Sequence, residues 1–364
     1  MVPQKTQGSR RKLLRALQLL RMQLLLPLRR LTMTGPAPRR PGGGAEGPRG
    51  ARAGGGAPGT RHTPRSCADA PPHGKVTGMA GHVQHTGTGD GPSDEARAAA
   101  EWQLWHERRT AVVSGPYGPL ALTGTHWLDD HPDGRIPGLP GRWTAEGDAV
   151  RLTGADGDGL TLDGAPFTGE ARLTADHGPI GEARAGHGER RFPVLHREGL
   201  WAVRDFDPGA PARRAFAGIE ATAYDARWAL PGRYVPYPER TGLRVRNADG
   251  VERGLGLDGE IVFELGGAER TLRVAVEDDG SLWAVFSDPT GTATGADPDG
   301  GNSSYRFRFL RPRPPAADGT VTVDFNRALL PPCAFADHFI CPFPPPGNTL
   351  PVPVTAGERR ATTR

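Results

Sequence analysis

Three residues near the C-terminal end carry side chains that can bind a metal ion. Cys333, His338 and Cys341 have the spacing C-x4-H-x2-C. A structural zinc site takes four ligands, and its cysteines usually lie closer together in sequence, so this triad is one ligand short. A disulfide between the two cysteines, or two neighbouring thiols that brace a loop, explains the pair without a metal. We therefore predict neither a metal nor a cofactor.

A set of polar residues around the cysteine pair suits an anionic ligand. Arginine donates paired hydrogen bonds to carboxylates and phosphates, and nearby Asp or Asn side chains can orient it. The alternative is that these arginines and acids form ion pairs with each other along exposed strand faces. The sequence leaves both interpretations open. The candidate ligand-binding residues are Arg306, Arg308, Asp324, Asn326, Arg327, Cys333, Cys341 and Asn348.

The segment that holds the cysteines is rich in proline and long for a simple connection. Pro331, Pro332 and Pro342 stiffen it, together with the run Pro344–Pro346. Long ordered loops often contribute to a functional site. The alternative is that this loop only covers one open end of a β-structure.

Several common catalytic templates are excluded. No lysine follows Lys75, so the body of the chain has no P-loop lysine and no Schiff-base lysine. Neither a GxSxG nucleophile motif nor an HExxH motif is present. The GxGxxG match at 254–259 is followed by a strand pattern, whereas a dinucleotide site needs a helix there. No catalytic residue is predicted, and enzymatic activity stays an open question.

The charge of the chain is divided unevenly. Residues 1–78 hold 15 basic and 2 acidic residues, and the remainder holds 30 basic and 39 acidic residues. The high isoelectric point therefore belongs to the N-terminal segment. Nucleic-acid binding depends on positive charge that displaces counterions, so we expect none for the acidic body.

The N-terminal segment has a composition that cannot form a core. Residues 35–92 contain 25 Gly plus Pro in 58 positions, and all 24 aromatic residues of the chain lie beyond position 100. The Leu-rich stretch 13–31 is interrupted by Arg15, Arg21 and Pro27, so it is too short to span a membrane. We predict a disordered, basic tail at 1–92, with Met79 as an alternative start of the natural protein. Cys67 lies in this segment, so only two of the three cysteines belong to the body, and with no cleavable signal this favours the cytoplasm.

One helix is predicted, at the start of the body. Ser93 is a good N-cap, and acidic residues follow it in the first turn. Residues 96–109 then have helical spacing, with Ala98, Trp102, Trp105 and Arg109 on one face. We expect this face to pack on a sheet.

Beyond residue 119 the apolar residues alternate with a period of two, and glycine-containing turns recur, which is typical of antiparallel strands. Segments 192–197 and 200–206 predict a hairpin. A β-meander is predicted from 243 to 286, with turns at Asp249-Gly250, Asp258-Gly259, Gly266-Gly267 and Asp278–Gly280. Two more strands are predicted at 305–310 and 320–325. The expected core or rim anchors are Trp127, Trp143, Trp201, Trp228 and Trp283.

These patterns predict a mainly β fold: an antiparallel β-sandwich or distorted barrel with one N-terminal helix. The predicted organisation is a single β-rich domain at 93–358 and a flexible C-terminus at 359–364.

Several motifs in this body resemble a bacterial family. The run DFNRALLPPCAF at 324–335, then CPFPPPGN at 341–348, then Ala356-Gly357-Glu358 are similar to the C-terminal signature of the domain of unknown function 1684 family. Similar motifs occur at 286–290, 305–310, 201–216 and 118–128, so the resemblance covers most of 100–358. It implies one β-rich domain and no particular activity. This chain differs from the family pattern in a longer Asp-Gly-rich loop between Thr290 and Tyr305.

The function expected from the sequence is a β-rich protein that binds a small anionic molecule. A noncatalytic protein-interaction module and a hydrolase-like enzyme of unassigned reaction are the alternatives. The substrate, the oligomeric state and the redox state of the two cysteines do not follow from the sequence.

Overall fold

The first element of the body is the predicted helix. The computed structural model describes residues 93–292 and 303–364, which belong to one compact unit. Helix α2 (Asp94–Val113) begins after Ser93, whose hydroxyl oxygen accepts a hydrogen bond from the Ala96 amide at 3.2 Å. The side-chain acceptor satisfies one of the free amides of the first turn, so the predicted cap is confirmed.

The next part of the chain forms two antiparallel sheets around one hydrophobic core. Trp143, Phe192 and Leu152 are fully buried in that core. One sheet has the order β1-β10-β8-β7-β4-β5, with β9 paired to β10, and the other has the order β2-β3-β6. The strands are β1 (Leu122–Trp127), β2 (Arg142–Glu146), β3 (Ala149–Gly154), β4 (Leu160–Leu162), β5 (Ala165–Pro166), β6 (Gly169–Leu173), β7 (Ala185–His187), β8 (Arg190–Arg191), β9 (Val194–Arg197) and β10 (Leu200–Phe206).

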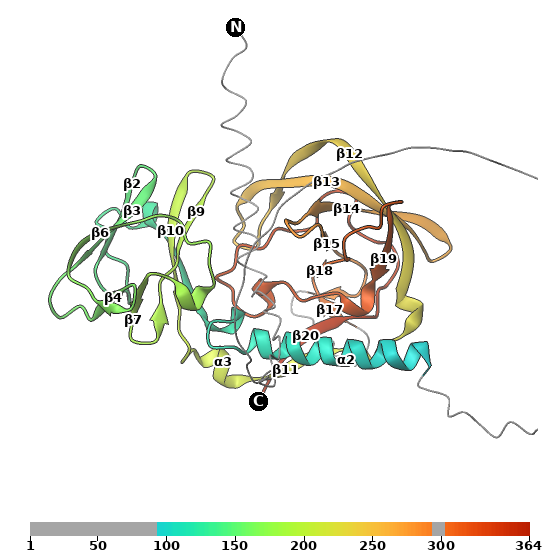
Figure 1. Cartoon of the computed structure of the whole chain (residues 1–364), viewed down its shortest axis with the longest axis horizontal. Helices are drawn as coiled ribbons and strands as arrows, with labels where there is room; N and C mark the ends of the chain where they lie inside the picture. Colours follow the sequence, from blue (N-terminus) through green and yellow to red (C-terminus); the bar gives the residue numbers. More distant parts are fainter. Residues whose placement is uncertain (1–92, 293–302) are drawn as a thin grey trace, which may run out of the picture. The chain divides into compact units, whose positions relative to one another are not determined.

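A short helix, α3 (Pro211–Ala215), leads into the second part. Here the main sheet has the order β18-β15-β14-β13-β12-β19 and curls into half a barrel, in which β12 and β13 arch over β14 and β15 (Figure 1). Two smaller pairs accompany it, antiparallel β11-β20 and parallel β16-β17. The strands are β11 (Phe216–Ala221), β12 (Ala229–Arg246), β13 (Glu252–Leu265), β14 (Ala268–Val276), β15 (Leu282–Phe286), β16 (Gly291–Thr292), β17 (Ser304–Tyr305), β18 (Arg308–Leu310), β19 (Thr320–Asp324) and β20 (Glu358–Thr363).

Short 3-10 helices connect several of these strands. Among them, η4 (Ala226–Trp228) precedes β12, η5 (Phe325–Arg327) follows β19, and η6 (Pro332–Ala334) holds Cys333. The others are η1 (Pro119–Ala121), η2 (Leu128–Asp130) and η3 (Ile180–Glu182). In the described residues no helix is both long enough and apolar enough to cross a membrane.

The predicted fold class is confirmed: the described chain is mainly antiparallel β with one long N-terminal helix. The predicted hairpin is β9–β10, in which Arg197 pairs with Leu200. Trp143, Trp201 and Trp283 are buried, and Trp127 and Trp228 are partly buried against hydrophobic clusters.

Three predicted details differ from the structure. Asp258-Gly259 is not a turn, because β13 runs through it and pairs with β12 on one side and β14 on the other. The expected strand at 305–310 is divided into β17 and β18. The expected flexible end at 359–364 instead lies in β20, which pairs with β11, and the Arg364 amide donates to Ala215 O at 2.8 Å. The predicted disordered tail at 1–92 and much of the Asp-Gly-rich loop lie outside the described residues.

Helix α2 is attached to the second part of the chain by side chains from one face, as predicted. Trp102 Nε1 donates to Asn326 O at 2.7 Å. Arg109 binds the buried Glu358 carboxylate at 3.1 Å and Leu330 O at 3.0 Å. Figure 1 shows the result, with α2 lying alongside β11 and β20.

Candidate functional site

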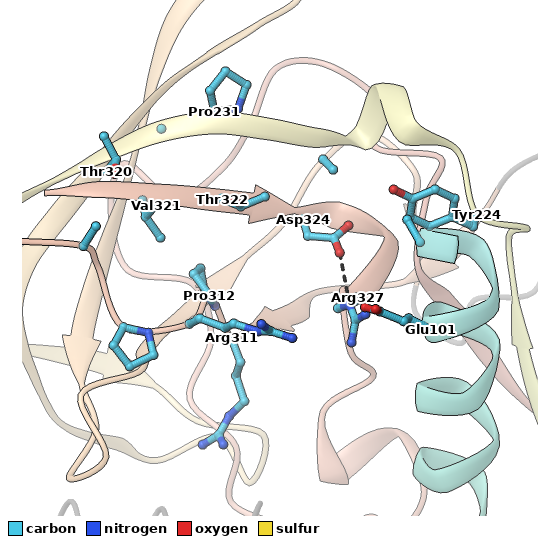
Figure 2. A pocket seen from close by; sticks show the side chains of 16 residues that line it. Glu101, Tyr224, Pro231, Arg311, Pro312, Thr320, Val321, Thr322, Asp324 and Arg327 are labelled. Atoms are coloured by element: carbon cyan, nitrogen blue, oxygen red, sulfur yellow. Dashed lines mark hydrogen bonds and ion pairs between the residues drawn. The ribbon is translucent and has the colours of Figure 1, made fainter. Parts of the chain in front are cut away.

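A pocket of about 650 Å³ opens between α2, the first residues of β12, the strand β19 and the loop that follows β18. Figure 2 shows its lining: Glu101 lies on α2, and Asp324, at the end of β19, lies next to Arg327. Charged side chains supply much of its polar surface. The charged lining residues are Glu101, Arg311, Arg313, Asp324 and Arg327.

Arg327 is held in place from two directions. Its Nε donates to Asp324 Oδ2 at 3.1 Å, and its guanidinium carbon lies 5.5 Å from the centre of the Trp105 ring. Asp324 is fixed in turn, because its Oδ1 caps η5 by accepting from the amide of Asn326 at 3.1 Å. Among the residues that the structure describes, the two terminal nitrogens of Arg327 have no hydrogen-bond partner. They are available to a ligand.

The other two arginines differ in their surroundings. Arg311 Nη2 donates to Glu277 Oε2 at 2.6 Å, and burial lowers the pKa of Arg311, while Glu277 opposes this effect. Arg313 is exposed and forms no ion pair with any described residue. Tyr224 lies at the rim near Asp324, and burial together with that carboxylate raises the pKa of its hydroxyl.

The lining offers several hydrogen-bonding groups. Guanidinium groups offer forked donors, and Thr320, Thr322 and Tyr224 add hydroxyl groups. Donors of this kind can bind and orient an anion or a polar molecule.

Residues 214–359 match a family model described as "Protein of unknown function (DUF1684)". The chain carries a DUF1684 domain. The chain is also similar to the solution structure of an uncharacterized protein from gene locus rrnAC0354 of Haloarcula marismortui, at 27% identity and a TM-score of 0.32, over 40% of this chain and 77% of that one. No curated protein matches the chain. The DUF1684 match includes β12, β19 and η5, whereas Ala98 and Glu101 of the pocket precede it.

Of the eight ligand-binding residues predicted from the sequence, Asp324 and Arg327 line this pocket. The other six lie elsewhere in the DUF1684 domain and do not line it. Two of these six, Asn326 and Asn348, are asparagines with fully buried side chains that clamp the backbone. Asn326 bonds both the amide and the carbonyl of Asp225, and Asn348 does the same to Arg273.

Arg308 is a structural residue inside the DUF1684 domain. Its side chain is 1% exposed, and its Nη2 donates to Asp288 Oδ1 at 2.8 Å. It also donates to the carbonyl oxygens of Val354 at 2.8 Å and Ala356 at 2.6 Å. Burial lowers the pKa of Arg308, and Asp288 opposes this shift. The arginine therefore ties β18 to the segment before β20.

Arg306 and the two cysteines form a separate group. The guanidinium carbon of Arg306 lies 4.8 Å from the ring centre of Phe343. Cys333 and Cys341 are buried free thiols, and the Cys333 amide donates to Cys341 Sγ at 3.4 Å. The thiol of Cys341 and the hydroxyl of Tyr305 both donate to Cys333 Sγ and lower its pKa, whereas burial raises the pKa of Cys341. In the described chain no group of three His, Cys, Asp or Glu side chains could hold a metal ion.

The sequence reasoning missed Glu101, Tyr224, Arg311 and Arg313. Two signals could have indicated three of them. Glu101 lies three residues after Ala98 and four before Trp105, so it borders the helix face that packs on the sheet. The alternation Arg-Pro-Arg-Pro at 311–314 is a stiff segment that presents cations next to a predicted strand.

Proposed function

We propose that the protein binds a small anionic molecule, with a carboxylate or phosphate group, in the pocket lined by Arg313 and Arg327. The observation that carries this proposal is the set of guanidinium donors in the lining that no described residue uses. Arg311 is engaged by Glu277, but Arg313 forms no ion pair with a described residue, and Arg327 binds Asp324 through its Nε alone. An anion would use the terminal nitrogens of Arg327 and the unpaired guanidinium of Arg313 as donors.

The dimensions of the pocket agree with this class of ligand. A volume of about 650 Å³ lies within the range of pockets that hold metabolites and drug-sized ligands. Arg327 is pre-oriented by Asp324 and Trp105, so binding costs little side-chain entropy there. We place the protein in the cytoplasm, where free thiols such as Cys333 and Cys341 persist. The acidic body of the chain does not favour nucleic acid as a partner.

The test is a thermal-shift screen of anionic metabolites, followed by calorimetric titration of any hit. We expect Arg327→Gln and Arg313→Ala each to weaken binding about 10-fold or more, the usual effect of losing a charged hydrogen bond. Arg227→Ala is the matched control, because Arg227 is exposed, is paired with Asp225 and does not line the pocket. If both pocket variants bind the hit as tightly as the control does, the proposal is wrong.

A further inference from the structure

Two buried arginines lie on one face of the β9–β10 hairpin, in a region separate from the pocket. Arg197 ends β9, and Leu200 of β10 is its direct partner. Arg204 is four residues beyond Leu200 on the same strand, and alternate residues of a strand share a face, so both arginines are on the same side of the sheet. Each is 5% exposed.

Among the described residues, no carboxylate forms an ion pair with either arginine. In the described part of the chain, Nε and Nη1 of Arg197 and Nε and Nη2 of Arg204 are buried without a hydrogen-bond partner. The acids that act on Arg197 are Glu198 and Asp249, and both are engaged elsewhere. Asp249 binds Arg253 through both oxygens at 2.8 and 2.7 Å, and Glu198 accepts from the Gly254 amide at 2.6 Å.

The C-terminal loop covers this face. Phe339 lies against Arg204, with 5.4 Å between its ring centre and the guanidinium carbon. Thr125, the partner of Arg204 on β1, donates to His338 O at 2.9 Å, and Asn247 Nδ2 donates to Ile340 O at 2.8 Å. The loop thus encloses the two guanidinium groups between β9–β10 and the end of β12.

Both arginines keep their charge in this enclosure. Burial lowers the pKa of Arg197 and Arg204 to about 10, so both are cations at neutral pH. The nearby thiol of Cys341 does not neutralise them, because burial raises its pKa and keeps it protonated. Isolated buried charges are unfavourable unless an opposite charge accompanies them.

We infer that Arg197 and Arg204 form an enclosed site for one small oxyanion of the phosphate or sulfate type. The planar fork of a guanidinium matches two oxygens of such an anion, and the buried Nε and Nη groups are the donors that it would satisfy. The low exposure limits the occupant to a few atoms. The anion neutralises the two cations beneath the 338–341 loop and so stabilises the loop in its place over β10. This site goes beyond the proposed function, because it shares no residue with the pocket.

The test uses the full chain, dialysed free of phosphate and sulfate and then titrated with each at constant ionic strength in sodium chloride. We expect a saturable rise of Tm, about 5 °C at a concentration of about 100 Kd. Labelling of Cys341 and Cys333 by a thiol reagent under native conditions should slow in parallel, since the anion holds the loop closed. A rise without saturation would be the general effect of excluded salts and would contradict the site.

Variants separate this site from other anion effects. Arg204→Met and Arg197→Met should each abolish the saturable response, and Arg204→Lys should weaken it because lysine lacks the fork. Arg172→Met, at an exposed arginine that does not line the pocket, should respond like the wild type. If Arg204→Met does not fold, the comparison of the Arg197→Met and wild-type titrations tests the site. An unresponsive wild type, a response to chloride alone, or a full response in the Met variants would overturn the inference.

Discussion

At the scale of single residues, the buried pair Arg308–Asp288 should be one of the most sensitive points of the fold. Removing one partner leaves the other charge buried and unpaired, which costs about 3–5 kcal/mol of the free energy of unfolding. Asp288→Ala also removes the acceptor for the amides of Thr290 and Val354. We expect a loss of this size in urea unfolding. Asp148→Ala, which breaks the exposed pair with Arg172, should cost less than about 1 kcal/mol.

A second residue-scale prediction concerns His126 and pH. Burial lowers the pKa of His126, and the charge of His131 lowers it further, while Asp205 opposes the shift. The unfolded chain therefore binds this proton more readily. The contribution of His126 to the free energy of unfolding is therefore full above the unfolded pKa of about 6.5. It decreases as the pH falls from there through the lower pKa of the folded state. Thermal unfolding between neutral and mildly acidic pH should show this decrease.

The matched variants assign the effect to that side chain. His126→Gln should make the dependence of Tm on pH flatter in this window, whereas His187→Gln, at an exposed histidine, should leave it as in the wild type. An unchanged slope in His126→Gln would show that other groups cause the acid sensitivity.

The sequence located the candidate site only in part, and the reason is physical. An arginine that binds a ligand and an arginine that binds a buried aspartate are the same residue type with different partners. Arg308 finds Asp288 and two backbone carbonyls, but Arg327 keeps two nitrogens free. Those partners come from 20 to 48 residues away in sequence for Arg308, so no local pattern reveals them.

At the scale of elements, the long paired strands of the half-barrel depend on small residues where their backbones lie close together. A Cβ atom at Gly259 would lie 2.5 Å from both the Val235 carbonyl oxygen and the Tyr234 ring, atoms of the paired strand β12. Gly259→Val should therefore cost about 1–3 kcal/mol in urea unfolding, the usual range for overpacking. Gly242→Ala on β12 is the control, since its Cβ would meet no atom within 4 Å, and we expect little change.

The same glycine explains why one predicted turn is wrong. Asp-Gly pairs usually mark tight hairpins, so Asp258-Gly259 predicted an end to the strand. In the structure Asp258 Oδ2 instead accepts from the Val276 amide at 2.9 Å, and Gly259 permits close contact with β12. Strand type and the β9–β10 hairpin were predictable from alternation and turn residues. Strand length was not, because it depends on neighbours that the local sequence does not specify.

At the scale of the whole molecule, the hydrophobic core extends beyond the DUF1684 match. The cluster around Trp283, Phe307 and Phe309 also contains buried residues that precede position 214. These are Val113, Leu120, Ala121, Leu122 and Phe206. The DUF1684 match therefore does not contain the whole of this core. We propose that the folding unit begins with α2.

A truncation tests this proposal. A fragment of residues 214–364 lacks those five core side chains, and it leaves the buried Glu358 carboxylate without Arg109. Losing a large buried side chain costs about 2–5 kcal/mol, and a whole domain is stable by only about 5–15 kcal/mol. We expect the fragment to show no cooperative urea transition, whereas residues 93–364 should unfold in one transition by tryptophan fluorescence and by circular dichroism. Cooperative unfolding of the fragment at the midpoint of the longer chain would mean that the second part folds alone and that α2 only rests on it.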